Sequence, residues 1–159
     1  MSPSAEVIPL HAPPPLWANQ RATVEKASDR PGFCDWSDPG TGKTRAHLQD
    51  FAQAGGRLLV VASKSILQPA WGNDIDHFFP GMTYTVANAN NREQAFKTPS
   101  DVVITNHDAV VWLAKQRKLL ASFNRFIADE STAFKNPNSQ RSKAMKDLAT
   151  RFKWRRVMS

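Results

Sequence analysis

The segment GTGKT (residues 40–44) restricts the possible folds of this chain more than any other feature. Phosphate-binding loops follow the pattern G-x-x-x-x-G-K-[ST] and lie between a strand and a helix. Here a short strand is predicted at 32–36 and a helix at 43–54, although Ser37 stands where the pattern has its first glycine. A helix that begins with this pattern by chance is the alternative, but the strand, loop and helix are in the correct register. The segment therefore predicts a loop that binds the phosphates of a nucleotide.

The residue types of this loop match that chemistry. Backbone N–H groups and the positive end of the following helix attract phosphate. Lys43 is expected to reach the β- and γ-phosphates, and the hydroxyl of Thr44 is expected to bind Mg²⁺. The predicted nucleotide-binding residues of the loop are Asp38, Pro39, Gly40, Thr41, Gly42, Lys43, Thr44 and Arg45.

Apolar strands alternate with amphipathic helices along the rest of the chain, which predicts an α/β fold with a mainly parallel sheet covered on both faces. We expect one domain at 13–159 and a flexible tail at 1–12. The further strands are predicted at 57–63, 82–86, 101–105, 125–129 and 153–159. The further helices are predicted at 16–29, 66–79, 107–121 and 140–151, with a short helix within the polar segment 87–94 and a loop at 130–140.

Composition limits the class of protein and its surroundings. The sequence has no apolar run of the ~18 residues that a membrane helix needs and no basic, then apolar, signal segment at its start. Cys34 is the only cysteine, so an internal disulfide and a cysteine cluster for zinc are excluded. We therefore expect a cytoplasmic protein, in the host cytoplasm if the chain is virus-encoded, with no membrane partner.

The charge is unevenly distributed. Residues 1–110 carry 9 basic and 11 acidic side chains, whereas residues 111–159 carry 12 basic and only 3 acidic ones. This asymmetry is consistent with nucleic acid as a partner and equally with a solvated basic face.

An acidic pair follows the predicted strand at 125–129. In a parallel sheet the carboxyl ends of the strands lie on the same side as the phosphate-binding loop. Asp129 is therefore expected to bind Mg²⁺ and Glu130 to act as the general base that activates water. A solvent-exposed acidic turn is the alternative.

Six segments in this order resemble the motifs of the first RecA-like lobe of superfamily 2 helicases, specifically the sucrose-nonfermenting-type (Snf-type) ATPases. They are PPPLWANQ (13–20, Q-motif), DPGTGKT (38–44, motif I), LLVVASKSILQPAWGNDIDHFFPG (58–81, motif Ia), DVVITNHDAV (101–110, motif Ib), RFIADESTAFKNPNSQRSKAM (125–145, motif II) and RRVMS (155–159, start of motif III).

The resemblance implies a P-loop NTPase fold, a three-layer αβα lobe that hydrolyses ATP with Mg²⁺ and moves on double-stranded DNA. It places Gln20 against the adenine. It places Ser63 and Lys64 of motif Ia along the DNA backbone, together with motif Ib, namely Thr105, Asn106 and His107. A helix cap is the alternative role for the motif Ib residues. The five tryptophans could stack on nucleic-acid bases, but packing in the core is favoured for each of them. A surface role is considered further for Trp71 alone, because its helix borders the DNA groove in the family.

The sequence departs from the family in two respects. Motif II usually reads Asp-Glu-Ala-His, and here Ser131 and Thr132 replace the last two residues. The family also uses a second RecA-like lobe, which supplies an arginine to the ATP site. The chain ends at Ser159, so we expect a monomeric fragment whose own ATPase activity is weak. Two alternatives remain: a non-enzymatic module that binds ATP and DNA or protein, and an unrelated P-loop phosphotransferase.

Overall fold

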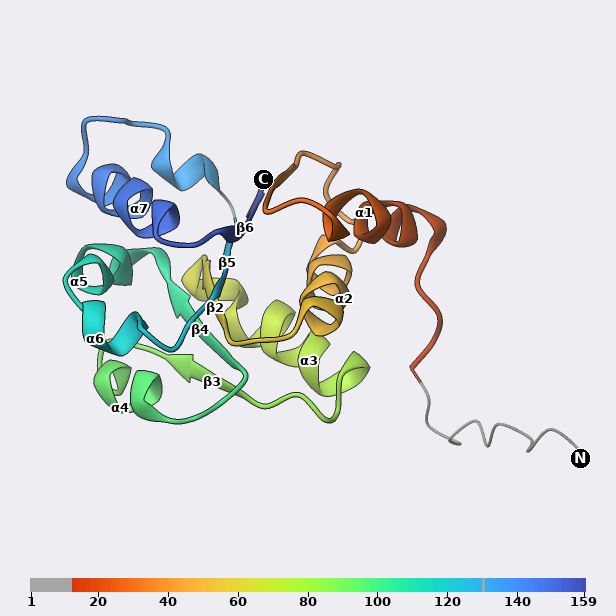
Figure 1. Ribbon diagram of the computed structural model, residues 1–159, viewed down its shortest axis with the longest axis horizontal. Helices are drawn as coiled ribbons and strands as arrows, with labels where there is room; N and C mark the ends of the chain where they lie inside the picture. The colour runs from red at the N-terminus through yellow and green to blue at the C-terminus, as the bar shows by residue number, and fades with distance from the viewer. Residues whose placement is uncertain (1–12, 130) are drawn as a thin grey trace, which may run out of the picture.

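The computed structural model describes residues 13–129 and 131–159, and in these ranges all strands form one parallel sheet (Figure 1). The order of the strands across the sheet is β1-β6-β5-β2-β4-β3. Their bounds are β1 (Gly32–Asp35), β2 (Leu58–Ala62), β3 (Tyr84–Ala87), β4 (Val102–Asn106), β5 (Arg125–Ala128) and β6 (Trp154–Met158). The predicted α/β fold with a parallel sheet is confirmed.

The central strands are apolar on both faces because helices cover both. Every residue of β2 is buried, and Val60 pairs with Ile104 of β4 on one side and with Ile127 of β5 on the other. Continuous apolar runs of this kind are typical of parallel strands buried on two faces.

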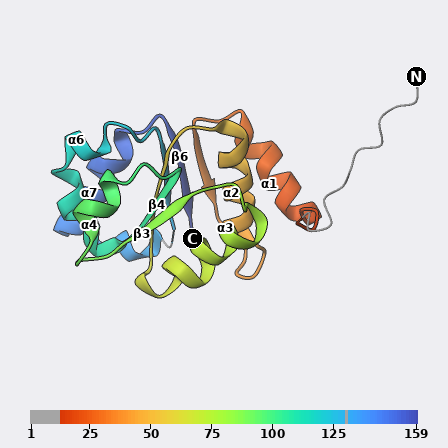
Figure 2. The same ribbon diagram turned by 90° about the horizontal axis from the view of Figure 1, so that it is seen from below.

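Helices cover the two faces of the sheet in two groups, as Figures 1 and 2 show from two directions. One face carries α4 (Arg92–Lys97), α5 (Val110–Ala114), α6 (Arg117–Leu120) and α7 (Gln140–Thr150). The other face carries α2 (Lys43–Ala54), α3 (Asn73–Phe78) and the π-helical turn η2 (Leu67–Gly72), and α1 (Ala18–Ser28) packs against α2. The lobe therefore has three layers, with a separate apolar core on each side of the sheet.

Three predicted elements differ from the observed ones. The helix predicted at 66–79 is a 3₁₀ turn, η1 (Lys64–Ile66), followed by η2 and α3. The helix predicted at 107–121 is divided into η3 (His107–Ala109), α5 and α6, because the backbone of Gln116 leaves the helical region with ψ of 55°. The predicted loop at 130–140 contains a 3₁₀ turn, η4 (Ser131–Phe134).

The strand predicted at 82–86 begins two residues later. Met82 donates its N–H to the Phe79 carbonyl at 2.9 Å and so closes a turn. The N–H of Thr83 is bound by the carboxylate of Asp101 at 2.9 Å. Both residues are therefore held by other partners before the regular ladder begins at Tyr84.

The short helix predicted within 87–94 lies later, as α4 (Arg92–Lys97), and the other predictions of position hold closely. Helix α2 begins and ends where expected, because Gly42 and Gly55 flank it with positive φ values of 72° and 71°. Ser139 caps α7 by accepting the N–H of Ser142 at 3.1 Å. The predicted tail at 1–12 lies outside the described residues. Among the described residues, no helix is long and apolar enough to cross a membrane.

Candidate functional site

The phosphate loop (residues 37–44) connects β1 to α2 at the carboxyl edge of the sheet, meaning the edge where the strands end. Gly40 and Gly42 have φ values of 78° and 72°, a backbone region that other residues enter only at a cost. A Cβ at Gly42 would also lie 2.3 Å from Nε2 of Gln20, whereas Gly40 has open space around it. The glycines therefore meet a conformational requirement at both positions and a steric one at Gly42.

The ammonium group of Lys43 turns back over the loop. Its Nζ donates to the carbonyl of Ser37 at 2.7 Å and also to the carbonyl of Ser159, which follows β6. Phosphate oxygens of a ligand would compete with these carbonyls for the same donor. Thr44, in the first turn of α2, is half-buried beside it.

Asp35, the last residue of β1, holds the start of the phosphate loop by hydrogen bonds. Its Oδ1 accepts hydrogen bonds from the N–H and the hydroxyl of Ser37, the N–H at 2.9 Å. Its Oδ2 lies 2.8 Å from Nε2 of the fully buried His47 on α2. Burial raises the pKa of Asp35, but the hydrogen bonds from His47 and Ser37 outweigh burial and hold that pKa well below its usual range.

We did not predict a role for Asp35 or His47. Two signals in the sequence could have indicated it. A carboxylate in a short strand directly before a phosphate-binding loop has few partners other than the loop itself. A histidine four residues after Lys43 lies one helical turn further along α2, on the side of Lys43.

Asp38 contributes to the structure of the loop through its backbone. Asp38 is exposed, and it is its backbone carbonyl that accepts the hydroxyl of Thr41 at 2.8 Å. Pro39 is exposed at the tip of the loop.

Helix α1 holds the outer side of the loop. Asn19 Nδ2 donates to the carbonyl of Thr41 at 2.7 Å, and Gln20 Nε2 donates to the carbonyl of Gly42 at 3.1 Å. Gln20 also accepts the N–H of Trp17 at 2.8 Å through its Oε1. The predicted adenine-binding residue is thus buried against the loop, with only 3% of its surface exposed.

Arg45 points away from the loop. Its guanidinium donates to the carbonyls of Pro14 and Pro15 and lies over the ring of Phe78, 4.0 Å from the centroid. Burial lowers its pKa, and the nearby charge of Asp74 partly opposes this effect. In the structure this side chain secures the segment before α1.

Asp129 lies at the end of β5, two strands away from β1. Its backbone and its side chain are both held: its N–H donates to Val61 at 2.8 Å, its carbonyl lies 2.8 Å from Nε2 of His107, and its Oδ2 accepts Nε1–H of Trp71 at 2.9 Å. Glu130, the predicted general base, lies outside the described residues.

Ser63 and Lys64 follow β2 at the carboxyl edge, where Ser63 begins the turn η1 and Lys64 is exposed. The motif Ib residues are less accessible. Thr105 is fully buried and donates to the carbonyl of Ala87, and Asn106 and His107 are exposed by 7% and 8%. The structure does not bring these three side chains to the surface, because they end a central strand that is covered on both faces.

The tryptophans divide into two groups. Trp71 is completely buried, Trp154 is buried and Trp112 packs against the core, so core packing is confirmed for these three, and the surface role considered for Trp71 is wrong. Trp17 and Trp36 are 58% and 67% exposed, so the prediction of core packing is wrong for both. Trp17 directly precedes α1, and Trp36 directly follows β1 at the start of the phosphate loop.

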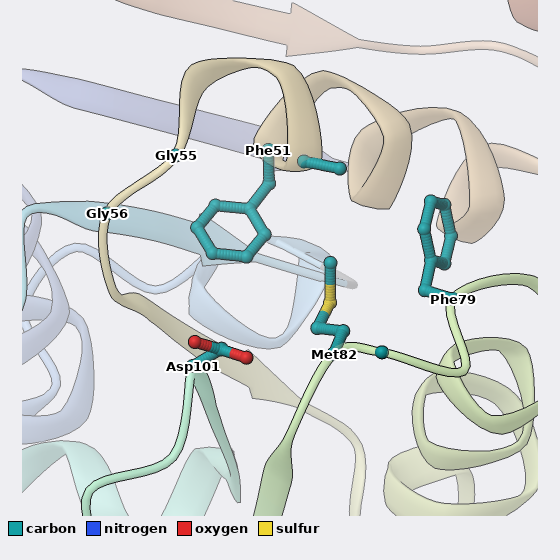
Figure 3. A pocket seen from close by; sticks show the side chains of 8 residues that line it. Phe51, Gly55, Gly56, Phe79, Met82 and Asp101 are labelled. Carbon is teal, nitrogen blue, oxygen red and sulfur yellow. The ribbon is translucent and has the colours of Figure 1, made fainter.

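A pocket of about 450 Å³ lies near the starts of β2 and β4, at the edge of the sheet opposite the phosphate loop (Figure 3). Phe51, Phe79 and Met82 point into it, with Gly55, Gly56 and Asp101 at its rim. None of the predicted site residues lines it.

The donor set at the carboxyl edge fits a magnesium ion bound together with phosphates. Mg²⁺ prefers oxygen ligands and is often held by one or two protein groups with waters and substrate phosphates. The hydroxyl of Thr44 and the carboxylate of Asp129 are such groups. Among the residues described, no cluster of three or more histidine, cysteine or carboxylate side chains forms a closed metal site.

Comparisons with known proteins agree with this architecture. Among solved structures, the chain is similar to the Sulfolobus solfataricus SWI2/SNF2 ATPase core in complex with dsDNA, with a TM-score of 0.80 and 21% identity over 96% of this chain and 33% of that one. The Sulfolobus solfataricus SWI2/SNF2 ATPase core domain matches with a TM-score of 0.71 and 21% identity over 96% and 32%. The UvsW helicase from Bacteriophage T4 matches with a TM-score of 0.65 and 14% identity over 91% and 52%.

At identities this low, the structural similarity establishes the fold alone. The chain spans about a third of the length of the two Sulfolobus chains. A comparison with curated protein sequences finds no match. The profile of the SNF2-related domain matches residues 18–155, which is most of the chain and confirms the resemblance inferred from the six motifs. The chain belongs to the SNF2-related domain family, as an N-terminal RecA-like lobe.

Proposed function

We propose that this chain is the ATP-binding lobe of a DNA-dependent ATPase that uses Mg²⁺ and, joined to a second RecA-like lobe, moves on double-stranded DNA. The observation that supports the proposal is that the predicted phosphate-binding and metal-binding residues lie at the same edge of the sheet. The phosphate loop, with Lys43 turned over it, and Asp129 meet at the same edge of one parallel sheet.

Each residue has a proposed role in binding. The N–H groups of the phosphate loop and the ammonium of Lys43 hold the phosphates, and Thr44 and Asp129 supply oxygen ligands for Mg²⁺. Gln20 is proposed to contact the adenine through the small part of its side chain that is exposed, while its amide holds the loop through Gly42. The bound ion would neutralise phosphate charge, and the chain's residues would orient that ion.

Hydrolysis requires two further contributions. Glu130 is proposed as the base that accepts a proton from the attacking water. An arginine from the second lobe is proposed to complete the site, and such a residue contributes about 10³- to 10⁵-fold in rate. We therefore expect a low turnover from the 159-residue chain, which we propose to be monomeric.

We propose contact with the DNA backbone at Ser63 and Lys64, since Lys64 offers an exposed ammonium at the carboxyl edge. The buried side chains of Thr105 and His107 favour a different role, in which they hold β3 against β4 and the backbone of Asp129 from the interior. Any contact of motif Ib with DNA would then use its backbone. The cytoplasmic location stays a prediction.

A binding experiment tests the nucleotide site. Titration of a fluorescent ATP analogue with Mg²⁺ into the 159-residue chain should show saturable binding, and Lys43→Ala should abolish it because the ammonium group is lost. Lys146→Ala, at an exposed lysine of α7, is the matched control and should bind as the unaltered chain does. Retained affinity in Lys43→Ala would overturn the site.

A second experiment tests hydrolysis in a chain that carries the second lobe. Glu130→Gln should leave ATP-analogue binding intact and remove DNA-stimulated turnover. An unchanged turnover would show that another group activates the water.

A further inference from the structure

The carboxylate of Asp129 is bound by an indole that comes from a distant part of the chain. Trp71 Nε1–H donates to Oδ2 of Asp129 at 2.9 Å, although the two residues are 58 positions apart. Trp71 belongs to the π turn η2 on one face of the sheet, and no part of its surface is exposed. The contact therefore lies in the interior, where a hydrogen bond is stronger than in water.

The backbone of the same residue is held from the opposite face. Nε2 of His107 lies 2.8 Å from the carbonyl of Asp129, and the His107 ring packs edge-on against Phe134 at 5.0 Å. The N–H of Asp129 is bound by Val61 of the neighbouring strand. The backbone of Asp129 is therefore held at both the N–H and the carbonyl, and Trp71 contacts its side chain.

The chemistry of the donor matters for a metal ligand. A lysine or arginine at this place would orient the carboxylate but would also place a positive charge beside the ion. An indole N–H only donates and carries no charge at any ordinary pH. It can therefore fix one carboxylate oxygen without placing a positive charge beside the proposed ion.

We infer that Trp71 is a positioning residue, which orients the carboxylate of Asp129 for Mg²⁺ through its indole N–H. The inference rests on the proposed role of Asp129 as a metal ligand. Packing alone does not account for the contact, because the apolar neighbours of Trp71 in this core, such as Leu67 and Ile75, would also accept a phenyl ring. The N–H group is what a phenylalanine lacks.

The test compares Trp71→Phe with the unaltered 159-residue chain. The affinity for a fluorescent ATP analogue is measured at a series of Mg²⁺ concentrations. The Mg²⁺ midpoint is the concentration at which half of the Mg²⁺-dependent gain in affinity is reached. Loss of a group that orients a metal ligand typically weakens metal binding by about 10- to 100-fold, so this midpoint should rise by about that factor. Affinity for the analogue in EDTA should stay unchanged. Trp154→Phe, at another buried tryptophan, is the matched control and should leave the midpoint where it is.

Asp129→Asn distinguishes a failure of this inference from a failure of the proposed function. If Asp129→Asn does not raise the Mg²⁺ midpoint, Asp129 is not a ligand and the proposed metal site fails. If Asp129→Asn raises the midpoint and a folded Trp71→Phe chain does not, the inference about Trp71 is overturned.

A measurement on the unaltered chain keeps the inference testable if Trp71→Phe does not fold. With tryptophan labelled with ¹⁵N and its indole signals assigned, Mg²⁺ added to the complex with a non-hydrolysable ATP analogue should shift the Trp71 signal and leave the Trp154 signal in place. A Trp71 signal that does not respond to Mg²⁺ would overturn the inference.

Discussion

His47 and Asp35 form a buried pair beneath the phosphate loop, with Nε2 of His47 2.8 Å from Oδ2 of Asp35. The same carboxylate binds Ser37, and the carbonyl of Ser37 binds the ammonium of Lys43. A continuous series of hydrogen bonds thus connects α2, β1 and the loop back to Lys43. Ser37, which replaces the first glycine of the consensus, is part of this network and so contributes a contact that glycine could not.

The free energy of unfolding of the lobe should fall at acidic pH because Asp35 becomes protonated. Its pKa in the folded chain lies below the value of about 3.9 for a free aspartate. Ionised Asp35 therefore stabilises the fold fully above about pH 4, and this contribution is lost as the pH falls below that value. Asp35→Asn keeps an oxygen acceptor but removes the charge.

Urea unfolding between pH 7 and pH 2.5 measures this dependence. The loss of stability caused by Asp35→Asn should be largest at pH 5–7 and should shrink below pH 4. Asp38→Asn, at an exposed carboxylate of the same loop, is the matched control. A difference for Asp35→Asn that stays constant to pH 2.5 would contradict the assignment.

Gln20 and Asn19 allow base recognition to be separated from support of the loop. Both side chains hold carbonyls of the phosphate loop, at 3.1 Å and 2.7 Å, but only Gln20 is proposed to contact adenine. Gln20→Ala should therefore weaken ATP binding more than GTP binding, whereas Asn19→Ala should weaken both equally. Competition titrations against a fluorescent analogue measure the ratio. Equal losses for the two nucleotides in Gln20→Ala would remove Gln20 from the adenine site.

The ion pair between Asp50 and Arg156 should dominate the stability of the β6 side of the sheet. Nε of Arg156 lies 2.7 Å from Oδ2 of Asp50, and the two side chains are 0% and 2% exposed. The guanidinium also binds the carbonyls of Ala27 and Pro31. Asp50→Ala leaves a buried charge without its partner, which should cost about 3–5 kcal/mol of unfolding free energy.

Denaturant unfolding at pH 7 measures that loss. The double variant Asp50→Leu with Arg156→Met should recover part of it, since no buried charge remains. A loss below about 1 kcal/mol in Asp50→Ala would show that the backbone carbonyls alone satisfy Arg156.

Lys64 should contribute to DNA binding through charge alone. Each phosphate contact adds about 0.9 to the slope of log affinity against log salt concentration, so Lys64→Ala should reduce the slope by about one unit for any duplex sequence. Fluorescence anisotropy with two unrelated duplexes measures the slope. Lys153→Ala is the control, because Lys153 is exposed just before β6, at the edge where the strands begin and opposite Lys64. Identical slopes for the two variants would exclude a contact at Lys64.

Local patterns in the sequence determined the parts of the fold that could be predicted. The loop and helix α2 are specified by glycines whose positive φ values few other residues adopt, and β2 and β4 by short, mainly apolar runs that are typical of buried strands. The order of motifs then identified the family, which the profile match confirms.

The contacts that cross long distances in the sequence could not be predicted in this way. No local pattern connects Trp71 with Asp129, or Asp50 with Arg156, which are 106 positions apart. The exposure of Trp17 follows from the position of α1 beside the loop, a tertiary property. The resemblance placed motif Ib along the DNA backbone, but it does not reveal the burial of Thr105 and Asn106 in β4.

The π turn Leu67–Gly72 makes the number of residues in this segment as important as their identity. Each residue of a helix turns the chain by about 100°, and a wide turn contains one residue more than an α-helical turn. Deletion of a single residue before Trp71 would therefore change the direction of the indole relative to β5 while every functional side chain stayed in the sequence. A chain could thus keep all of these functional residues and still lose the alignment of Asp129, its proposed metal ligand.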